Sequence, residues 1–363
     1  MPALAVRERS RAVSFMNVLL CLLVVFIHVS SHPVTALDRR SLSYAVVFIP
    51  WRFASFAVPG FFFLSGLRTF YKDPERRGWR AFYLGRIRRV VLPYLFWCAV
   101  YYAYFIWRGY EAFSIARFLS GVLTGTIFGP FYFVAALLQF YILAPLWKGL
   151  IRRAPPQVAL PIAALLTPLF YINFPALLRT INPDWHFPYT DRLCLTYLIY
   201  FLAGCYAGER YEAFARLLKK RLSLVGAAFG VLAVLDIGLA WAVSSGRLVF
   251  ARLEYIHYLY CLAAVAFFMA LFFGLENRLP FPGLLRAVDL GSYGIYLLHG
   301  LLIYLCNDAL ASLGVQRVRA AYALRLIFVY SGAVGLTLAF QDIKARLQKE
   351  KGRINRPAGR HPR

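Results

Sequence analysis

The chain has 363 residues, of which 61% are hydrophobic and 16% charged, and its mean hydropathy is +0.60. So much apolar surface cannot be hidden in the core of a soluble domain of this size, which excludes an ordinary soluble enzyme and indicates a polytopic membrane protein. The formal net charge is +25, and the basic residues follow the edges of apolar stretches, where anionic lipid headgroups attract them. We therefore expect the lipid bilayer as a partner, and no nucleic acid.

Apolar stretches of about 17 to 25 residues can be counted as spanning helices. Ten of them follow along the chain, at 15–31, 44–66, 91–107, 131–147, 157–172, 193–207, 222–243, 253–274, 290–313 and 320–340. The fifth contains Pro161 and Pro168 and is expected to be short and kinked. The sequence thus predicts an all-α transmembrane bundle of about ten spans.

The distribution of basic residues predicts the orientation of this bundle. With the N-terminus inside, 29 of the 41 Lys and Arg residues fall in inside segments, which favours both termini on the cytoplasmic side of the plasma membrane. Residues 1–14 then form a cytoplasmic N-terminus, 15–341 the membrane domain, and 342–363 a basic tail that is disordered or adsorbed to the membrane surface. The six cysteines lack any close Cys/His spacing, so neither disulfides nor a bound metal are expected.

One ionisable residue, His28, lies inside the first apolar stretch. An imidazole in hydrocarbon loses hydration that no aliphatic neighbour replaces, so such a residue is a functional-site hypothesis, and its pKa range suits it to proton transfer. Asn17 precedes it by eleven residues, which returns to within about 20° of the same helix face, roughly 16.5 Å away along the axis. The alternative is a buried histidine that only hydrogen-bonds between helices.

The connection after the second stretch is strongly basic. Arg86 and Arg89 are three residues apart on an expected helix and would project from one face, where two guanidinium groups suit the phosphates of a nucleotide-containing donor. The alternative is anchoring to lipid headgroups. Upstream, Pro59, Gly60 and Ser65 lie in the segment VPGFFFLSG, which predicts a broken or kinked helix that could line a cavity.

The ninth stretch carries a polar stripe. Ser292, Tyr296 and His299 share a face at spacings of four and three, and could bind a polar substrate or lock helices together by hydrogen bonds. Counted from Leu290, His299 falls midway through its span, whereas His28 is expected further out.

Two other polar groups are placed in or beside apolar stretches. Asp236 is an acid within the seventh stretch and could pair with Arg52 or with His28. His257 and Glu254, near the start of the eighth, are weaker site candidates because we expect both at the outer interface.

Five segments in this order resemble the acyltransferase 3 family of integral membrane acyltransferases. They are the late first-span histidine, FFFLSG, RIRRVVLPY, FYFVAALLQFYILAPL and SYGIYLLH. The resemblance implies transfer of an acyl group, commonly acetyl, from cytoplasmic acyl-CoA to a hydroxyl of an envelope carbohydrate or glycolipid, with no permanently bound cofactor. It also implies that His28 is catalytic, as base or as nucleophile, and that Arg86 and Arg89 contact the donor.

Two positions depart from the pattern of that family. A basic residue usually stands eleven positions before the histidine, where this chain has Asn17, and Arg11 is a possible substitute. A tryptophan common in the fourth-span motif is Tyr132 here. The competing hypotheses are an exporter or flippase of polysaccharide or lipid-linked sugar, and a non-catalytic scaffold. Substrate movement in liposomes without acyl-CoA would favour the exporter.

Overall fold

The computed structural model describes residues 10–71, 75, 78–184, 187–276, 278 and 282–354, and this part of the chain is helical without strands. The α-helices are α1 (Arg11–Ala36), α2 (Leu42–Ala54), α3 (Ala57–Tyr71), α4 (Trp79–Arg86), α5 (Leu92–Trp107), α6 (Ile115–Thr124), α7 (Tyr132–Ile142), α8 (Ala144–Arg153), α9 (Pro156–Ile181), α10 (Leu198–Glu209), α11 (Tyr211–Lys220), α12 (Leu222–Ser244), α13 (Leu253–Leu275), α14 (Pro282–Ser312) and α15 (Val318–Ile354). Ile87–Val91 forms a π-helix, and Gly129–Phe131, Thr190–Arg192 and Cys194–Tyr197 form 3₁₀-helices.

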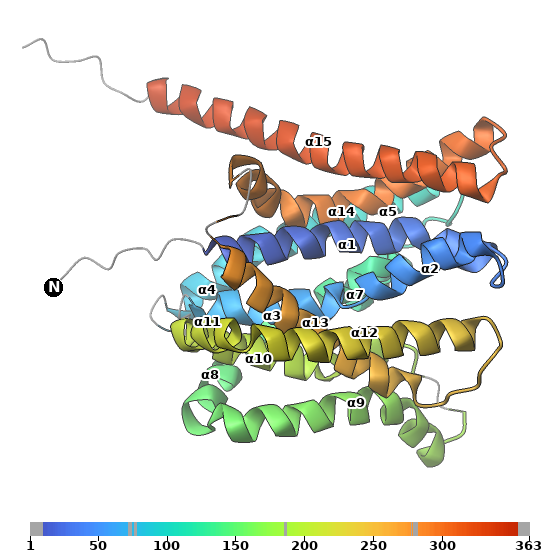
Figure 1. The fold of residues 1–363 in the computed structure, drawn as a ribbon. Coiled ribbons are helices and arrows are strands. Elements are labelled where there is room, and N and C mark those ends of the chain that lie inside the picture. The colour runs from blue at the N-terminus through green and yellow to red at the C-terminus, as the bar shows by residue number, and fades with distance from the viewer. Residues whose placement is uncertain are drawn as a thin grey trace, which may run out of the picture.

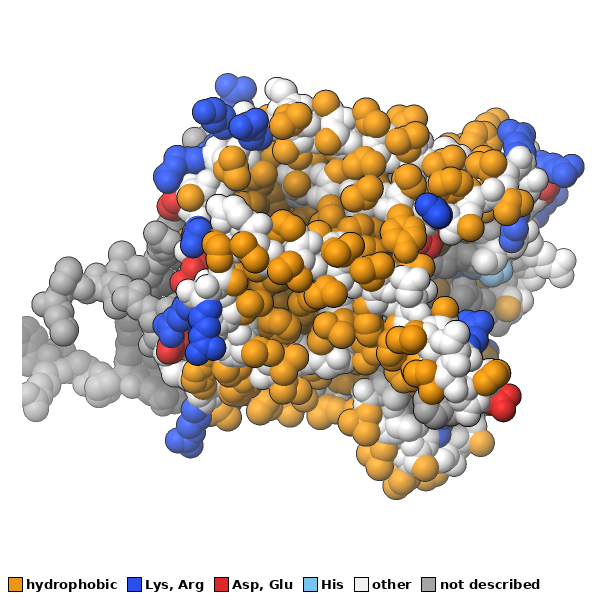
Figure 2. All heavy atoms as spheres, turned by 90° about the horizontal axis from the view of Figure 1, so that it is seen from below, with side chains coloured by type: hydrophobic (Ala, Val, Ile, Leu, Met, Phe, Trp, Pro, Cys, Tyr) orange, Lys and Arg blue, Asp and Glu red, His pale blue; other side chains and the backbone are white. Residues whose placement is uncertain are grey.

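The long helices run side by side in one bundle with α1 in its interior (Figure 1). Helix α1 begins, and α15 ends, at the end of the bundle that also carries α4, α8 and α11; we call it the α4 end. Hydrophobic side chains cover the middle of the face in Figure 2, with Lys and Arg mostly at its two ends. This arrangement is the one that a bilayer requires, because apolar groups face lipid and charges face water.

The all-α membrane bundle is confirmed, but the number of spans differs from ten. In the described part of the chain, eight helices are long and apolar enough to cross a membrane, or nine if Ile115–Thr124 and Gly129–Ile142, which meet at 56°, count as one. The difference lies in the predicted sixth span, which forms the 12-residue α10 after a short 3₁₀ segment. The predicted fourth span ends early too, since the chain leaves α7 at Ile142.

Prolines shape two of the spans in different ways. The predicted break in the second span is present, but at Ser55 and Phe56, between α2 and α3. Pro59 explains this position, because it has no N–H to donate to the carbonyl of Ser55, four residues earlier. Helix α9 is by contrast longer than predicted, with 26 residues and three internal prolines. In an apolar environment the backbone N–H and C=O groups that the prolines do not affect keep their hydrogen bonds only if the helix continues.

Helices α3 and α10 make an especially close contact, which glycines allow. A Cβ atom on Gly204 would lie 2.0 Å from the carbonyl oxygen of Phe63, and one on Gly208 would lie 2.4 Å from that of Leu67. From the other side, a Cβ on Gly66 would lie 2.2 Å from the carbonyl of Phe201. This is small-residue association of membrane helices, and it fixes α10 in the interior although it is short.

The basic tail was expected to be disordered or adsorbed to the membrane surface from Lys344 onward. As far as Ile354 the structure shows a helix, α15, and not disorder, whereas adsorption to the membrane surface stays a prediction. Residues 1–9 of the predicted N-terminal segment and 355–363 of the tail lie outside the described residues.

Candidate active site

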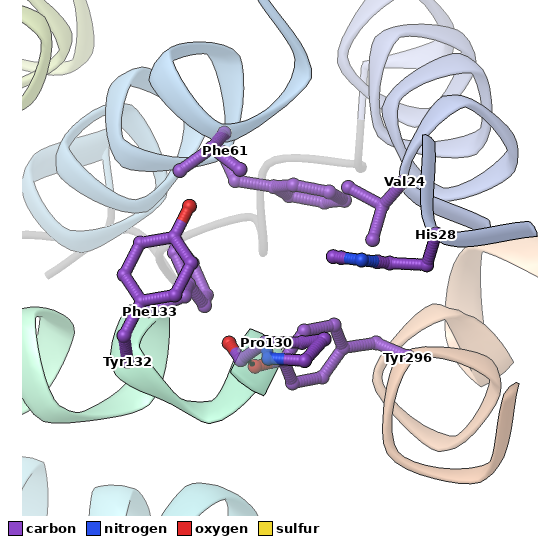
Figure 3. A pocket seen from close by; sticks show the side chains of 8 residues that line it. Val24, His28, Phe61, Pro130, Tyr132, Phe133 and Tyr296 are labelled. Carbon is purple, nitrogen blue, oxygen red and sulfur yellow. Dashed lines mark hydrogen bonds between the residues drawn. The ribbon is translucent and has the colours of Figure 1, made fainter. Parts of the chain in front are cut away.

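His28 projects from α1 into a small internal cavity of about 20 Å³, which is room for about one water molecule. The walls come from α3, the 3₁₀ segment before α7, and α14, and include Phe61, Pro130 and Tyr296 (Figure 3). The hydroxyl of Tyr296 donates to the carbonyl of Pro130 at 2.7 Å, which holds that wall in place. The first-span histidine therefore reaches a space enclosed by residues from three distant parts of the chain.

The second histidine of the bundle interior, His299, lies beside His28. Their ring centroids lie 5.3 Å apart with an interplanar angle of 31°. The prediction that His28 lies further out than His299 is wrong, because α14 begins at Pro282 and not at Leu290. His28 follows the first residue of α1 by 17 positions, and His299 follows the first residue of α14 by 17 positions as well. The parallel helices thus bring both rings to one level.

His299 is held in a defined orientation. It is fully buried, and its Nδ1 lies 2.6 Å from the carbonyl oxygen of Tyr296. A carbonyl only accepts, so Nδ1 carries the proton and the neutral ring keeps a lone pair on Nε2. That Nε2 is buried without a hydrogen-bond partner among the described residues. Beside His28, the structure therefore offers a second proton acceptor that is already oriented.

Asn17 lies on the same side of α1 as His28 but contacts a different cluster, nearer the α4 end. Its Nδ2 donates to Oδ1 of Asp289 at 2.7 Å and to Oγ of Ser292 at 2.8 Å. Ser14 donates to the other carboxylate oxygen of Asp289 at 2.8 Å. The eleven-residue spacing correctly places Asn17 and His28 on the face that meets α14, and Ser292 belongs to this cluster and not to the cavity of His28.

The cation of this cluster comes from α3. Arg68 donates from Nη1 to Oδ1 of Asn17 at 2.9 Å and from Nη2 to Oδ1 of Asp289 at 3.0 Å. The Asp289 side chain is fully buried and that of Arg68 is 30% exposed. Arg11, which the sequence suggested as a substitute, has an exposed side chain at the start of α1. No local pattern pointed to Arg68, because 51 residues separate it from Asn17.

The two arginines proposed to contact the donor lie in different settings. Arg86, the last residue of α4, donates to Oγ1 of Thr69 at 2.8 Å, and its guanidinium lies 4.9 Å from the ring of Phe82 and 4.1 Å from that of Tyr141. Arg89 is exposed and lies in the π-helical segment. A π-helix changes the angle per residue, so the α-helical argument for a shared face does not apply across this join. Arg86 is thus the preorganised member of the pair.

The remaining candidate on α3, Ser65, is half-buried, and its carbonyl accepts a hydrogen bond from Thr69 at 2.7 Å. It is not among the described lining residues of the His28 cavity or of the larger cavity introduced below.

The intramembrane acid Asp236 has its charge balanced by a basic partner. It is fully buried, and Arg52 donates to its two oxygens from Nε at 2.9 Å and Nη2 at 2.8 Å. Of the two partners that the sequence suggested, Arg52 is therefore the one that pairs. His257, which sequence analysis ranked low, contacts the same carboxylate through Nδ1 at 3.1 Å. His257 and Glu254 line a second cavity of about 370 Å³.

The described residues contain no group of three or more His, Cys, Asp or Glu side chains that could hold a metal ion.

These features define a helical membrane protein with paired histidines in its interior and a fixed arginine at one end. The family model described as an acyltransferase domain, that of the acyltransferase 3 family, matches residues 12–341, and the chain belongs to this family. It is a membrane-bound acyltransferase.

A curated relative agrees with this assignment. The Bacillus subtilis (strain 168) protein YfiQ, named as a membrane-bound acyltransferase, is 24% identical over 281 residues, which cover 75% of this chain and 74% of the relative. No solved structure matches the chain significantly.

Proposed function

We propose that this acyltransferase moves an acyl group, acetyl in the first instance, from acyl-CoA to a hydroxyl group of a cell-envelope or extracellular carbohydrate at the plasma membrane. The observation that supports it most is the His28–His299 pair, two imidazoles at one depth beside an enclosed cavity. Acyl transfer to a hydroxyl needs a base for its proton and a site shielded from water. The pair and the cavity supply both.

The donor is expected to approach from the α4 end. Arg86 is held there between two aromatic rings and uses one of its guanidinium donors on Thr69, so others remain for a phosphate oxygen. The nucleotide part of acyl-CoA is anionic and the acyl thioester is at the far end of an extended arm. An arm that enters between the helices would carry the thioester from Arg86 toward His28. Arg89 would contribute only long-range attraction.

In the reaction, the acceptor oxygen attacks the thioester carbonyl while His28 removes the hydroxyl proton. Collapse of the tetrahedral intermediate breaks the C–S bond, and the CoA thiolate leaves and recovers the proton from His28. His299, with its Nε2 lone pair beside His28, stabilises the protonated ring or shares the proton. Direct general-base action by His28 is the simplest scheme that balances, because it forms one bond and breaks one with no covalent enzyme intermediate.

The test uses the purified protein with acetyl-CoA and a carbohydrate acceptor. His28→Ala is expected to abolish release of CoA and formation of the acetylated product, both measured by mass spectrometry. His32→Ala is the matched control, since His32 lies one turn further along α1 with an exposed side chain. Full transfer by His28→Ala would disprove the catalytic role. If sugar moves across liposomes without acyl-CoA, the exporter hypothesis gains instead.

A further inference from the structure

The second cavity, of about 370 Å³, is much larger than the small cavity of His28. It shares two lining residues, Val58 and Tyr132, with the small cavity of His28, and Ile27, next to His28 in the chain, lines it as well. Its volume falls within the range of sites for small ligands. A ligand that fills this cavity would therefore have one end beside the small cavity into which His28 projects.

The position of the cavity separates it from the expected donor path. Glu254 and His257 belong to the first two turns of α13, and Asp191 to the 3₁₀ segment that follows α9. These turns lie toward the end of the bundle opposite to the α4 end (Figure 1). Arg86 and this cavity thus approach the histidine pair from opposite directions, as a two-substrate transfer across the bundle requires.

The lining combines aromatic rings, hydroxyls and acidic groups. Five tyrosines contribute, at 132, 171, 197, 200 and 258, together with the hydroxyls of Ser55, Thr167 and Thr196. The ring of Tyr258 is fixed because its hydroxyl donates to the carbonyl of Ala164 at 2.8 Å. Fixed aromatic rings with interspersed hydrogen-bonding groups suit a ring that is apolar on its faces and hydroxylated at its edges.

The charges that line the cavity are acidic. Among its described lining residues are the carboxylates of Asp191 and Glu254, and no Lys or Arg. The nearby cations are engaged elsewhere. Arg52 binds Asp236 through two hydrogen bonds, and Arg192 pairs with Asp191 and donates to the carbonyl of Thr124. An anionic ligand would meet the carboxylate of Glu254 and the already paired Asp191, with no Lys or Arg among the described lining residues to balance its charge, and bringing like charges together is unfavourable.

His257 is the oriented polar group of this cavity. Its Nδ1 contacts the buried Asp236, itself held by Arg52, so residues of α2, α12 and α13 lock the imidazole. With Nδ1 on the carboxylate, Nε2 is the ring atom left for a ligand, as an acceptor in the neutral ring and as a donor in the protonated one. Its neighbour is Sγ of Cys261 at 3.6 Å, a weak hydrogen-bonding partner that a ligand hydroxyl would readily replace.

We propose that the larger cavity binds the acyl acceptor, that the acceptor is a polyhydroxylated ring without an anionic group, and that His257 forms a hydrogen bond with one of its hydroxyls. This inference rests on the proposed function and deepens it, because it selects neutral or amino sugars over uronic acids and sugar phosphates. His257 is an acceptor-binding residue here, whereas His28 carries the chemistry.

The kinetic test compares methyl β-glucopyranoside with methyl β-glucopyranosiduronate, its matched acid, at saturating acetyl-CoA. The wild-type protein is expected to favour the neutral sugar in kcat/KM by about tenfold or more, and Glu254→Gln should narrow that ratio. His257→Gln should raise KM for the neutral sugar about tenfold with kcat little changed, which is the split between KM and kcat that loss of a binding contact produces. Equal use of both sugars, or preference for the acid, would overturn the proposal, and so would an unchanged KM in His257→Gln.

A second measurement does not depend on turnover. Cys261 is the one cysteine among the described lining residues, so a membrane-permeant maleimide located by mass spectrometry reports on the cavity. Methyl β-glucopyranoside should slow labelling of Cys261 and leave Cys306 unaffected, whereas the uronate should protect neither. Protection without any acyl transfer would support the binding site and reject the proposed function. Transfer without protection of Cys261 would reject the binding site alone.

Discussion

Arg68 on α3 donates a hydrogen bond to Oδ1 of Asn17 on α1 at 2.9 Å, and with its other terminal nitrogen pairs with Asp289 on α14. One guanidinium thereby ties together the two helices that carry His28 and His299. The family resemblance led us to expect a cation on α1 itself. In this chain the charge occupies nearly the same place but comes from a different helix.

An exchange of side chains tests that interpretation. Arg68→Asn removes a cation paired with a fully buried carboxylate, so we expect a loss of about 3 kcal/mol, the lower end for a broken buried pair because Arg68 is partly exposed. The double variant Asn17→Arg/Arg68→Asn should regain most of the stability and of the transfer rate. Thermal unfolding in detergent measures the stability of each variant, and an acyl-transfer assay measures its rate. A double variant as impaired as Arg68→Asn would show that the cation must come from α3.

His299 should matter for rate more than for binding. His299→Gln removes the Nε2 lone pair beside His28, and we expect kcat to fall about 100-fold, within the range for acid–base groups, with the KM values for both substrates little changed. His32→Gln, on the exposed side of α1, serves as the control. A variant of His299 with normal kcat would leave His28 as the sole proton acceptor.

The two arginines near the donor should differ in effect. Arg86→Ala removes the preorganised guanidinium, and since a hydrogen bond to a charged group contributes about 1.5–3 kcal/mol, KM for acyl-CoA should rise about 10-fold to 100-fold. Arg89→Ala should change KM by less than about threefold, like the exposed neighbour Arg88→Ala. Steady-state kinetics over a range of acyl-CoA concentrations distinguishes them. Equal effects of all three variants on KM would indicate that the basic segment attracts acyl-CoA through its overall positive charge and that Arg86 has no special role.

The close contact between α3 and α10 predicts a large stability difference between two Gly-to-Ala changes. Gly204→Ala places a Cβ 2.0 Å from a backbone oxygen that cannot move aside, so we expect a strongly lowered unfolding temperature or loss of folded protein. Gly238→Ala on α12 meets no atom within 4 Å and should be neutral or stabilising by up to about 1 kcal/mol. Unfolding curves for both, recorded in the same detergent, test the prediction. Similar curves would mean that the helices can separate at little cost.

Hydropathy identified most of the long spans, because a bilayer demands about 20 apolar residues wherever a helix crosses it. It failed at α10, where the short helix is enclosed by other helices and its place is set by Gly204 and Gly208 against α3. It also predicted too short a helix at α9. Pro161 and Pro168 each remove one backbone hydrogen bond, but the helix continues because an apolar environment offers no other partners for its backbone groups.

Within the site, local periodicity was informative where the relevant residues share one helix. The spacing from Asn17 to His28 and the stripe from Ser292 to His299 follow from 3.6 residues per turn, and the structure brings these two faces together. Hydrogen bonds between helices that are far apart in the chain leave no periodic pattern in the sequence. The contact of His257 with Asp236, and that of Arg68 with Asn17, depend on which helices become neighbours.

Hydrophobicity and helical period act over a few consecutive residues, and they were enough to predict a helical membrane protein with an isolated histidine in an apolar span. Three relationships became visible only in the folded bundle: His28 meets His299 at one depth, Arg68 supplies the charge beside Asn17, and the larger cavity adjoins the small cavity of His28. Those relationships arise from helix register and from close backbone approach, which depend on contacts between residues far apart in the chain.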